Sequence, residues 1–194
     1  KNHISVSPES NLLFNKNELN IFKKLKKEFS VLLLQQEIPI DINIELLKIA
    51  NESGIKTIYD PGPPNKFNNY DHFKFVDFLT PNKHEAEYLL GKKIDGIELG
   101  AAKELKEIGA NHVIITLGSE GLVYSGDFDH IFKPIEVNAI DSVGSGDCFN
   151  GALASMINKG ENIFNSIAFA QKAASLSTTR KGASKSFPFL HEIT

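Results

Sequence analysis

The sequence is poor in the residues that build cross-linked proteins and membrane spans. It contains one cysteine, Cys148, which excludes internal disulfides and zinc sites built from several thiolates. Its apolar runs, such as residues 31–34, are strand-sized and far short of the roughly 18 residues that a membrane helix needs. We therefore expect no membrane partner.

The chain also lacks a surplus of basic residues. Its 21 Lys and Arg residues stand against 24 Asp and Glu residues, which gives a formal net charge of −3. A protein whose main partner is nucleic acid needs a basic surplus on one face, so we expect no nucleic-acid partner. The 194 residues, 41% of them hydrophobic, suffice for one domain with a sizeable core.

The beginning of the sequence does not resemble a natural start. Lys1 stands in place of a methionine, and residues 4–6 already form a strand pattern. We therefore expect the natural start to be missing from this chain. No targeting segment occurs in these residues, and we expect a cytoplasmic protein.

Strand and helix patterns alternate along the first part of the chain. Short apolar runs predict strands at residues 4–6, 31–35, 55–59, 75–79 and 113–117. Apolar residues at helical spacing predict helices at residues 17–29, 42–51, 85–90 and 99–108. A stretch rich in Pro, Gly and Asn, residues 60–70, predicts a loop.

The alternation changes after residue 120. Residues 121–125 and 130–137 form two β patterns joined by a Gly-Asp pair, which predicts a hairpin. Two long helical patterns follow, at residues 147–158 and 163–178. Repeated βα units with short loops predict an α/β fold with a mostly parallel sheet, helices on both of its faces and a small hairpin near residues 121–137.

Polar residues follow the predicted strands. In open α/β sheets, ligands bind outside the carboxyl ends of the strands, so we expect these residues to line one edge of the sheet. They are Gln36 and Glu37, Asp60, Thr80 and Asn82, Gly118 and Ser119, and residues 141–147.

The strongest local motif is residues 141–147, which read Asp-Ser-Val-Gly-Ser-Gly-Asp and precede a predicted helix. Small residues let backbone N–H groups approach an anion, and a helix N-terminus adds unpaired donors and about half a positive charge, which predicts a phosphate cradle. No G-x-x-x-x-G-K-[ST] pattern occurs, so the motif is not a P-loop. A carboxylate at Asp147 would repel phosphate unless it takes a proton from an attacking hydroxyl. The alternative is that Asp147 is an N-cap and the glycines form a turn.

Two further acids have a structural and a functional interpretation. Asn82 followed by Glu85 is typical of a capping box, and both residues are also suited to lie near a triphosphate and its Mg²⁺. Glu37 follows an apolar strand, where it is either a solvated turn acid or an acceptor for sugar hydroxyls. The six histidines show no metal-binding spacing, and we expect Cys148 to be a buried small hydrophobe.

The motif extends into a family signature. Residues 141–153 resemble the C-terminal signature of the ribokinase (PfkB-type) carbohydrate kinases, and the resemblance covers nearly the whole chain. Four other segments agree in order and spacing: residues 34–39, 80–87, 115–121 and 179–184. Two of them, Gln-Glu-Ile-Pro and Thr-Arg-Lys-Gly-Ala, are similar to the ribose-specific branch rather than to the adenosine or fructose kinases.

The resemblance implies a ribokinase-like fold and the ATP-dependent phosphorylation of a sugar hydroxyl, with D-ribose converted to ribose 5-phosphate. Asp147 would be the general base and would contact the sugar, Glu37 would hold a sugar hydroxyl, and the anion hole would comprise Gly144, Ser145 and Gly146. The residues that the resemblance places along ATP are Asn82, Thr116, Leu117, Gly118, Ser119, Glu120, Gly121, Gly146, Asp147 and Gln171.

The resemblance also implies Mg²⁺ and K⁺ as cofactors. Glu85 would hold Mg²⁺ through water. The monovalent-cation site, formed mostly by backbone carbonyls, would comprise Asp141, Val143, Ser177, Arg180, Gly182 and Ser186. Ser142 and Ser145 stand where the family more often has Thr and Ala, changes too small to block a site made of backbone groups.

The family's first hundred or so residues have no counterpart here. By resemblance they carry part of the sugar site and the strands of a lid, so residues 1–194 would be the C-terminal two-thirds of a ribokinase-like domain, and the full-length protein would form a homodimer through the lid. Two alternatives stay open: a related kinase for another sugar, a nucleoside or a vitamin, and a non-catalytic nucleotide-binding module. Such a module has no need of the acid at Asp147.

Overall fold

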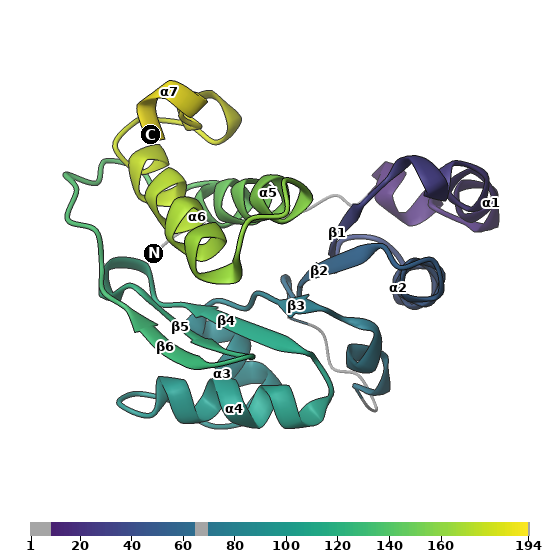
Figure 1. Cartoon of the computed structure of the whole chain (residues 1–194), viewed down its shortest axis with the longest axis horizontal. Coiled ribbons are helices and arrows are strands. Elements are labelled where there is room, and N and C mark those ends of the chain that lie inside the picture. Colours follow the sequence, from purple (N-terminus) through teal and green to yellow (C-terminus); the bar gives the residue numbers. More distant parts are fainter. Residues whose placement is uncertain (1–8, 65–69, 194) are drawn as a thin grey trace.

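The computed structural model describes residues 9–64 and 70–193, so the strand predicted at residues 4–6 lies outside it. In the described part of the chain, six strands form one sheet in chain order (Figure 1). The strands are β1 (Val31–Gln35), β2 (Lys56–Asp60), β3 (Phe78–Leu79), β4 (His112–Thr116), β5 (Leu122–Ser125) and β6 (Asp129–Phe132).

Strands β1 to β4 are parallel, and β5 and β6 form an antiparallel hairpin against β4. This confirms the predicted mostly parallel sheet and the hairpin. Two strand lengths were wrong. Residues 133–137 leave the sheet after β6, and β3 is shortened because Asp71–Phe75 forms a 3₁₀ helix that buries Phe73 completely against Tyr59.

Seven helices are described, and they cover both faces of the sheet as predicted (Figure 1). They are α1 (Lys16–Leu25), α2 (Ile40–Glu52), α3 (Lys83–Leu90), α4 (Glu98–Ile108), α5 (Ser145–Asn158), α6 (Ile163–Ser177) and α7 (Leu190–Ile193). The helix predicted at residues 17–29 is divided, because Lys26–Glu28 continues as a 3₁₀ turn after α1. The short α7 was not predicted.

Each face of the sheet carries its own hydrophobic core. Helices α1 to α4 pack on one face, where Leu47 and Leu105 belong to the same buried cluster as Tyr59 of β2. Helices α5 and α6 pack on the other face, where Leu153 and Ile167 belong to the same cluster as Ile58, which precedes Tyr59 on β2. Successive side chains of a strand point to opposite faces, so strands covered on both faces are continuously apolar. No helix in the described ranges is both long and apolar enough to cross a bilayer.

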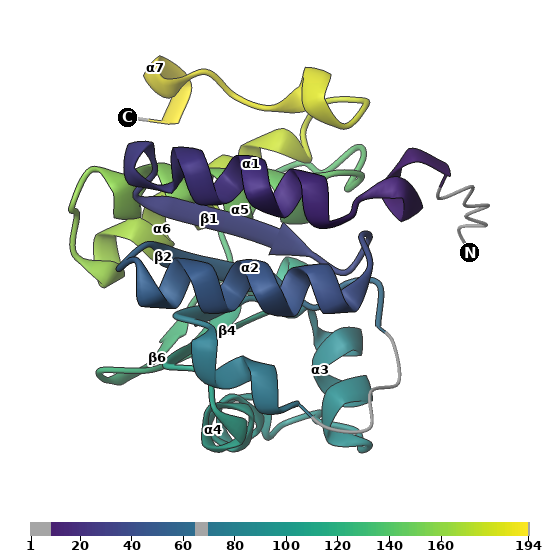
Figure 2. The same ribbon diagram turned by 90° about the vertical axis from the view of Figure 1, so that its right-hand side faces the viewer.

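The carboxyl ends of the parallel strands lie along one edge of the sheet. Gln35 at the end of β1 is the register partner of Asp60 at the end of β2, and Asn82 forms a parallel bridge with Thr116. Helix α5 packs against β1 near this edge (Figure 2). The structure thus confirms that the polar residues after the strands gather on one side of the molecule.

Candidate active site

Helix α5 begins in a glycine turn. Gly144 is its N-cap, with φ of 77°, and makes no side-chain capping bond. A Cβ atom at Gly144 would lie 3.1 Å from Ala183 Cα, so the turn needs glycine both for its conformation and for its close neighbour. Asp147 is the third residue of the helix. The alternative that Asp147 is the N-cap is therefore wrong.

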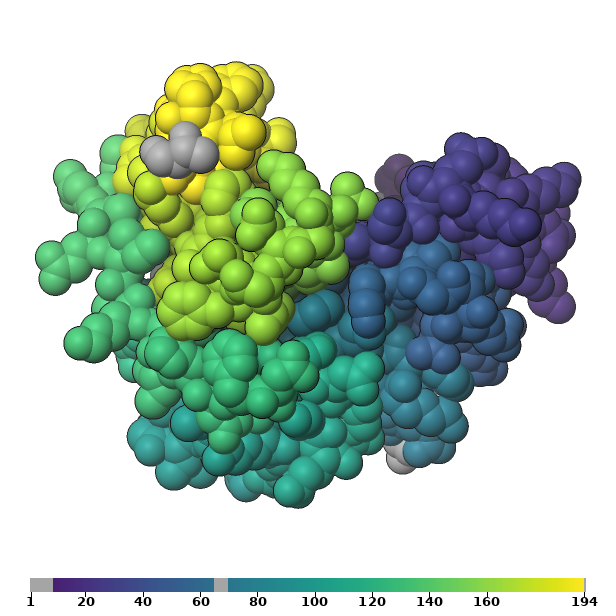
Figure 3. Space-filling model, in the orientation of Figure 1, coloured from purple at the N-terminus to yellow at the C-terminus, as the bar shows by residue number. Residues whose placement is uncertain are grey.

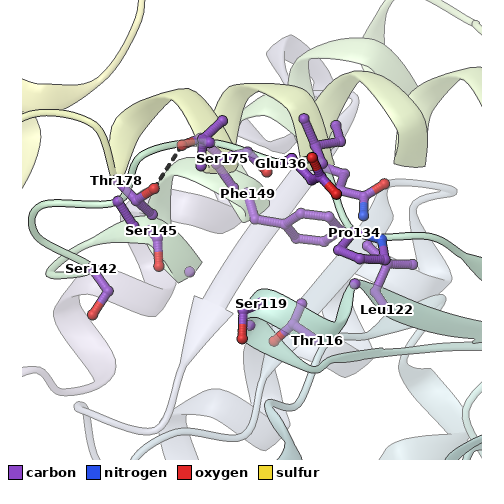
Figure 4. A pocket seen from close by; sticks show the side chains of 18 residues that line it. Thr116, Ser119, Leu122, Pro134, Glu136, Ser142, Ser145, Phe149, Ser175 and Thr178 are labelled. Atoms are coloured by element: carbon purple, nitrogen blue, oxygen red, sulfur yellow. Dashed lines mark hydrogen bonds between the residues drawn. The ribbon is translucent and has the colours of Figure 1, made fainter.

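A cavity of about 690 Å³ opens beside this turn, a size typical of a site for a small ligand. Figure 4 shows Thr116 and Ser119 on one side of it and Ser145, Ser175 and Thr178 on the other. The residues expected along ATP or in the anion hole that line it are Thr116, Gly118, Ser119, Gly121, Ser145, Gly146 and Gln171. Leu117 and Glu120 belong to the same loop but do not line the cavity.

More than half of the residues that line the cavity were not predicted as site residues. After β6 the chain runs through Pro134, Ile135, Glu136, Val137 and Ala139, which line the cavity without forming a strand. The wall is completed by Phe149 of α5, by Ala174 and Ser175 of α6 and by Thr178 at the C-cap of α6, together with Leu122 and Ser142. Residues 171, 174, 175 and 178 share one helix face. Polar residues such as Asn165, Lys172 and Ser177 occur elsewhere on α6, so no sequence pattern marks that face.

Asn82 and Glu85 form the capping box that one interpretation predicted. Asn82 Oδ1 accepts a hydrogen bond from the Glu85 backbone N–H at 2.9 Å, and Glu85 Oε2 accepts one from the Asn82 backbone N–H at 2.7 Å. The side-chain amide of Asn82 also donates to Glu85 Oε1. The box holds the carboxylate of Glu85 toward Gly62, beside the strand edge.

Two amide–carboxylate hydrogen bonds tie α5 to the ends of β1 and β2. Gln35 Nε2 donates to Asp147 Oδ1 at 2.8 Å, and Asn150 Nδ2 donates to Asp60 Oδ2 at 2.9 Å. Asp147 and Asn150 are three residues apart and so lie on one face of the helix. Asp60 Oδ1 accepts a further bond from the Gly62 backbone N–H at 2.9 Å.

Acidic groups converge at this edge. A Cβ atom at Gly62 would lie 2.6 Å from Glu85 Oε1 and 3.1 Å from Asp60 Oδ1, so both carboxylates flank this glycine. The pKa of Asp60 is raised to about 7, chiefly by burial and further by the charges of Glu85 and Asp147, while the bonds from Gly62 and Asn150 act against the rise. Burial also raises the pKa of Glu85. The hydrogen-bond donors at this edge therefore do not fully offset the mutual repulsion of its carboxylates.

Glu37 lies in the turn after β1, and its side chain is exposed. Cys148 is buried as expected, and burial raises the pKa of its thiol. Within residues 9–64 and 70–193, no three His, Cys, Asp or Glu side chains are grouped as direct metal ligands. A cation at this edge would have to share its shell with water or phosphate.

Three of the six residues expected at a monovalent-cation site are joined by hydrogen bonds. Asp141 Oδ2 accepts a hydrogen bond from the Gly182 backbone N–H at 2.9 Å, and Oδ1 accepts one from Val143 N–H at 3.1 Å. These two donors hold the pKa of Asp141 below its usual range. The Arg180 guanidinium pairs with Glu192, so its side chain turns away from Asp141 toward α7.

The hydroxyls of the two serines expected at that site, Ser177 and Ser186, are buried and donate to the carbonyls of Ala174 and Ala183. The side chains of the expected set thus have protein partners. A cation there would have to be bound mainly by backbone carbonyls, which stays a prediction.

The space-filling view shows the hairpin and α6 (teal to light green) on one side of the molecule, and α1 and α2 (purple to blue) on the other (Figure 3). The N-terminus of α5 has contacts with both: Ser145 and Gly146 line the cavity, and Asp147 bonds to Gln35 of β1. A phosphate held at the cavity end of this helix would therefore lie next to a carboxylate that faces the other side.

Comparisons with known proteins identify relatives of this architecture. The model of the family described as "pfkB family carbohydrate kinase" matches residues 3–190. The curated ribokinase of Lactococcus lactis is 34% identical over 175 residues, a match that covers 90% of this chain and 55% of that protein. The chain thus spans about half the length of the curated relatives it matches.

Solved structures agree. The crystal structure of ribokinase from Thermotoga maritima superposes with a TM-score of 0.87 at 33% identity, covering 100% of this chain and 64% of that one. The structure of Arabidopsis thaliana ribokinase complexed with ribose and ATP gives a TM-score of 0.78 at 27% identity, covering 93% of this chain and 58% of that one.

Proposed function

The chain belongs to the pfkB family of carbohydrate kinases, and on that premise we propose that it transfers the terminal phosphoryl group of ATP to a hydroxyl group of a sugar. One observation carries the proposal. At the N-terminus of α5, Ser145 and Gly146 line a cavity of nucleotide size, and the next residue, Asp147, reaches toward β1. This arrangement suits a reaction in which the two substrates meet at one helix end.

ATP would occupy the cavity. The apolar wall made by Val137, Phe149 and Ala174 suits a flat base. The triphosphate would then lie toward Gly144–Gly146, where the backbone N–H groups of the first helical turn and the helix dipole favour negative charge.

Asp147 would act as the general base. Its carboxylate would take the proton of the acceptor hydroxyl as the hydroxyl oxygen forms a bond to the terminal phosphorus, and the bond from that phosphorus to the ADP oxygen would break. The N–H groups at residues 144–146 would stabilise the charge that spreads over the phosphoryl oxygens. Positioning and electrostatics would supply most of the rate.

The acidic edge fits a water-mediated Mg²⁺ site. Magnesium prefers one or two carboxylates together with water and phosphate oxygens, and Glu85 and Asp60 are two carboxylates on either side of Gly62. Since both oxygens of Glu85 already accept bonds from Asn82, water would mediate its contact. When bound, Mg²⁺ would neutralise charge on the phosphates.

K⁺ would act more indirectly, on the loop before α5. The bond between Asp141 and Gly182 fixes this loop to the segment after α6, and a cation bound by backbone carbonyls there would hold the N–H groups of the anion hole in place. Turnover should rise on adding KCl at constant ionic strength, and a flat response would remove the cation from the mechanism.

D-ribose is the proposed acceptor. The names of the relatives support it, and so does Glu37, an exposed carboxylate that follows the strand bearing the partner of Asp147. A carboxylate at this position can accept hydrogen bonds from sugar hydroxyls.

An acceptor panel tests the proposal. ADP release would be measured with ATP and ribose, deoxyribose, fructose, adenosine or pyridoxal, and the phosphorylated position would be read by ³¹P NMR. We expect the highest kcat/KM with ribose and phosphate on its primary hydroxyl. Preference for a nucleoside or a vitamin would reassign the acceptor. ATP binding without acceptor-dependent ADP release from any of them would leave a nucleotide-binding module.

A further inference from the structure

Gln35 is the residue that contacts the proposed base. Its side-chain amide donates to Asp147 Oδ1 at 2.8 Å, across 112 positions of sequence. Gln35 is the last residue of β1 and is half-buried, whereas the side chain of Asp147 is exposed. An exposed aspartate samples several rotamers, so a fixed donor on a neighbouring strand restricts it strongly.

The donor itself is held rigidly. The Gln35 carbonyl accepts a hydrogen bond at 2.8 Å from the side-chain amide of Asn43, which is completely buried on α2. The next residue, Gln36, donates its backbone N–H to the Gly62 carbonyl at 2.9 Å. The backbone on both sides of the Gln35 side chain is therefore anchored, and the amide is presented from a fixed point.

The chemistry of the pair is directional. The amide nitrogen can only donate, so it binds one carboxylate oxygen, Oδ1, and leaves Oδ2 to accept the proton of a hydroxyl. We propose that Gln35 is the positioning residue of Asp147, fixing the carboxylate so that Oδ2 faces the acceptor hydroxyl. The inference rests on the proposed function of Asp147 as general base.

Asp147 lies among other acidic groups, so the charge of the side chain at position 35 matters for the bond. The charge of Asp147 acts on two titratable neighbours, Asp60 of β2 and the adjacent Cys148 of α5, and the charge of Glu85 of α3 also acts on Asp60. A further carboxylate, Glu37, lies in the turn after β1. A neutral donor at position 35 adds no further negative charge to this set, whereas a carboxyl there would donate only while it is protonated.

Two substitutions test the positioning role. Gln35→Met removes the donor at similar volume, and we expect kcat to fall about tenfold to a hundredfold with the KM for ATP unchanged, since misplaced catalytic groups cost rate rather than nucleotide binding. Gln35→Glu should regain much of the lost kcat at acid pH, where the introduced carboxyl is protonated and donates, and should lose it as the pH rises. Asn51→Met, at an exposed amide near the end of α2, is the matched control and should change neither constant.

A structural role alone gives a different pattern. If Gln35 only supported β1, both variants would lose kcat equally at every pH, or the KM for ATP would rise, and the inference would be overturned. A wild-type kcat in Gln35→Met would overturn it too. Asp147→Asn separates it from the proposed function: that variant should lose about 10²–10⁴ in kcat, and the double variant Gln35→Met/Asp147→Asn should be no slower than Asp147→Asn.

One arm needs no catalysis. Thermal unfolding of the two single variants and the double variant measures the coupling of the pair directly, and we expect the shifts in the unfolding midpoint to be non-additive. If Asp147→Asn keeps its turnover, or the wild-type protein shows none, the proposed function fails and this coupling still tests the contact. Additive shifts would overturn the inference while leaving the proposed function intact.

Discussion

The two sides of the α5 N-terminus differ in how they would recognise a ligand. On the cavity side, Glu136 is the one charged residue among the described residues that line the wall, and the rest are glycines, small polar residues and apolar residues. On the β1 side, Glu37, Asp60, Glu85 and Asp147 bring four carboxylates to one edge of the sheet. Ligand recognition on the cavity side would depend on shape and on backbone groups, whereas recognition on the β1 side would depend on charge.

This difference indicates that the two substrates would bind on different sides of the helix end. Substitutions on the cavity side should change the binding of the nucleotide, whereas substitutions on the acidic side should change the rate or the binding of the sugar. The four predictions that follow test whether the two sides separate in this way.

Asp147→Asn should have the largest effect. The carboxylate is proposed to take the acceptor proton, and removal of a general base typically costs about 10²–10⁴ in rate. The affinity for ATP should stay within about twofold, because Asp147 does not line the cavity. Steady-state kinetics and ATP titration measure the two quantities. Glu161→Gln, at an exposed acid before α6, is the control, and a wild-type kcat in Asp147→Asn would sink the assignment.

Glu37→Gln should act on the sugar alone. Hydrogen bonds to a charged group contribute about 1.5–3 kcal/mol, so the KM for sugar should rise roughly tenfold to a hundredfold. The KM for ATP should hardly change. Glu52→Gln, at the far end of α2, should leave both constants as they are. A raised KM for ATP with an unchanged KM for sugar would move Glu37 to the nucleotide side.

Ser175→Leu should act on the nucleotide alone. The added side chain would project from α6 into the cavity and take space that the adenine ring of ATP would occupy. We therefore expect the KM for ATP to rise about tenfold with the KM for sugar unchanged. Ser155→Leu makes the same change at an exposed position of α5 and should have no effect. Unchanged ATP binding in Ser175→Leu would show that the nucleotide lies elsewhere.

The smallest expected effect concerns stability. The pKa of Asp60 rises from 3.8 to about 7 on folding, so the folded state holds a proton between these values that the unfolded state has lost. The free energy of unfolding should therefore fall as the pH rises through this window. We expect a total contribution of about 1 kcal/mol over this window, below the upper limit that roughly 1.4 kcal/mol per pKa unit sets.

Asp60→Asn isolates that contribution, because it cannot ionise. Its stability relative to the wild type should rise between pH 5 and pH 8, as measured by urea unfolding, whereas the exposed Asp41→Asn should show no such trend. Mg²⁺ should raise the wild-type midpoint more at pH 8 than at pH 5. A Mg²⁺ effect that is equal at both pH values would place the ion away from Asp60.

Much of the fold could be predicted because each βα unit has its own local sequence pattern. Strand β1 was predicted residue for residue, and the hairpin was predicted from its turn. Strand β3 was overestimated because an aromatic run such as residues 73–79 suits a strand and a buried 3₁₀ turn equally well, and only packing against Tyr59 decides between them.

The candidate site also contains residues that local patterns predict and residues that they do not. Glycine-rich turns and capping boxes are local patterns, so residues 144–147 and Asn82 with Glu85 could be singled out. The pair formed by Asp60 and Glu85, and the bond from Gln35 to Asp147, join distant segments and leave no trace in spacing. The cavity wall at residues 134–139 has no regular structure, so no periodicity marks it.

The tie between Asp141 and Gly182 has a consequence for how the protein matures on the ribosome. All six described strands are complete by residue 132, yet the loop before α5 gains its partner only when Gly182 has emerged. Closing such separated contacts is slow compared with local folding, since chain entropy must be overcome first. On a nascent chain all six described strands would therefore have been synthesised well before the anion cradle gains its tie, and the order of synthesis would keep the site incomplete until the scaffold that supports it is present.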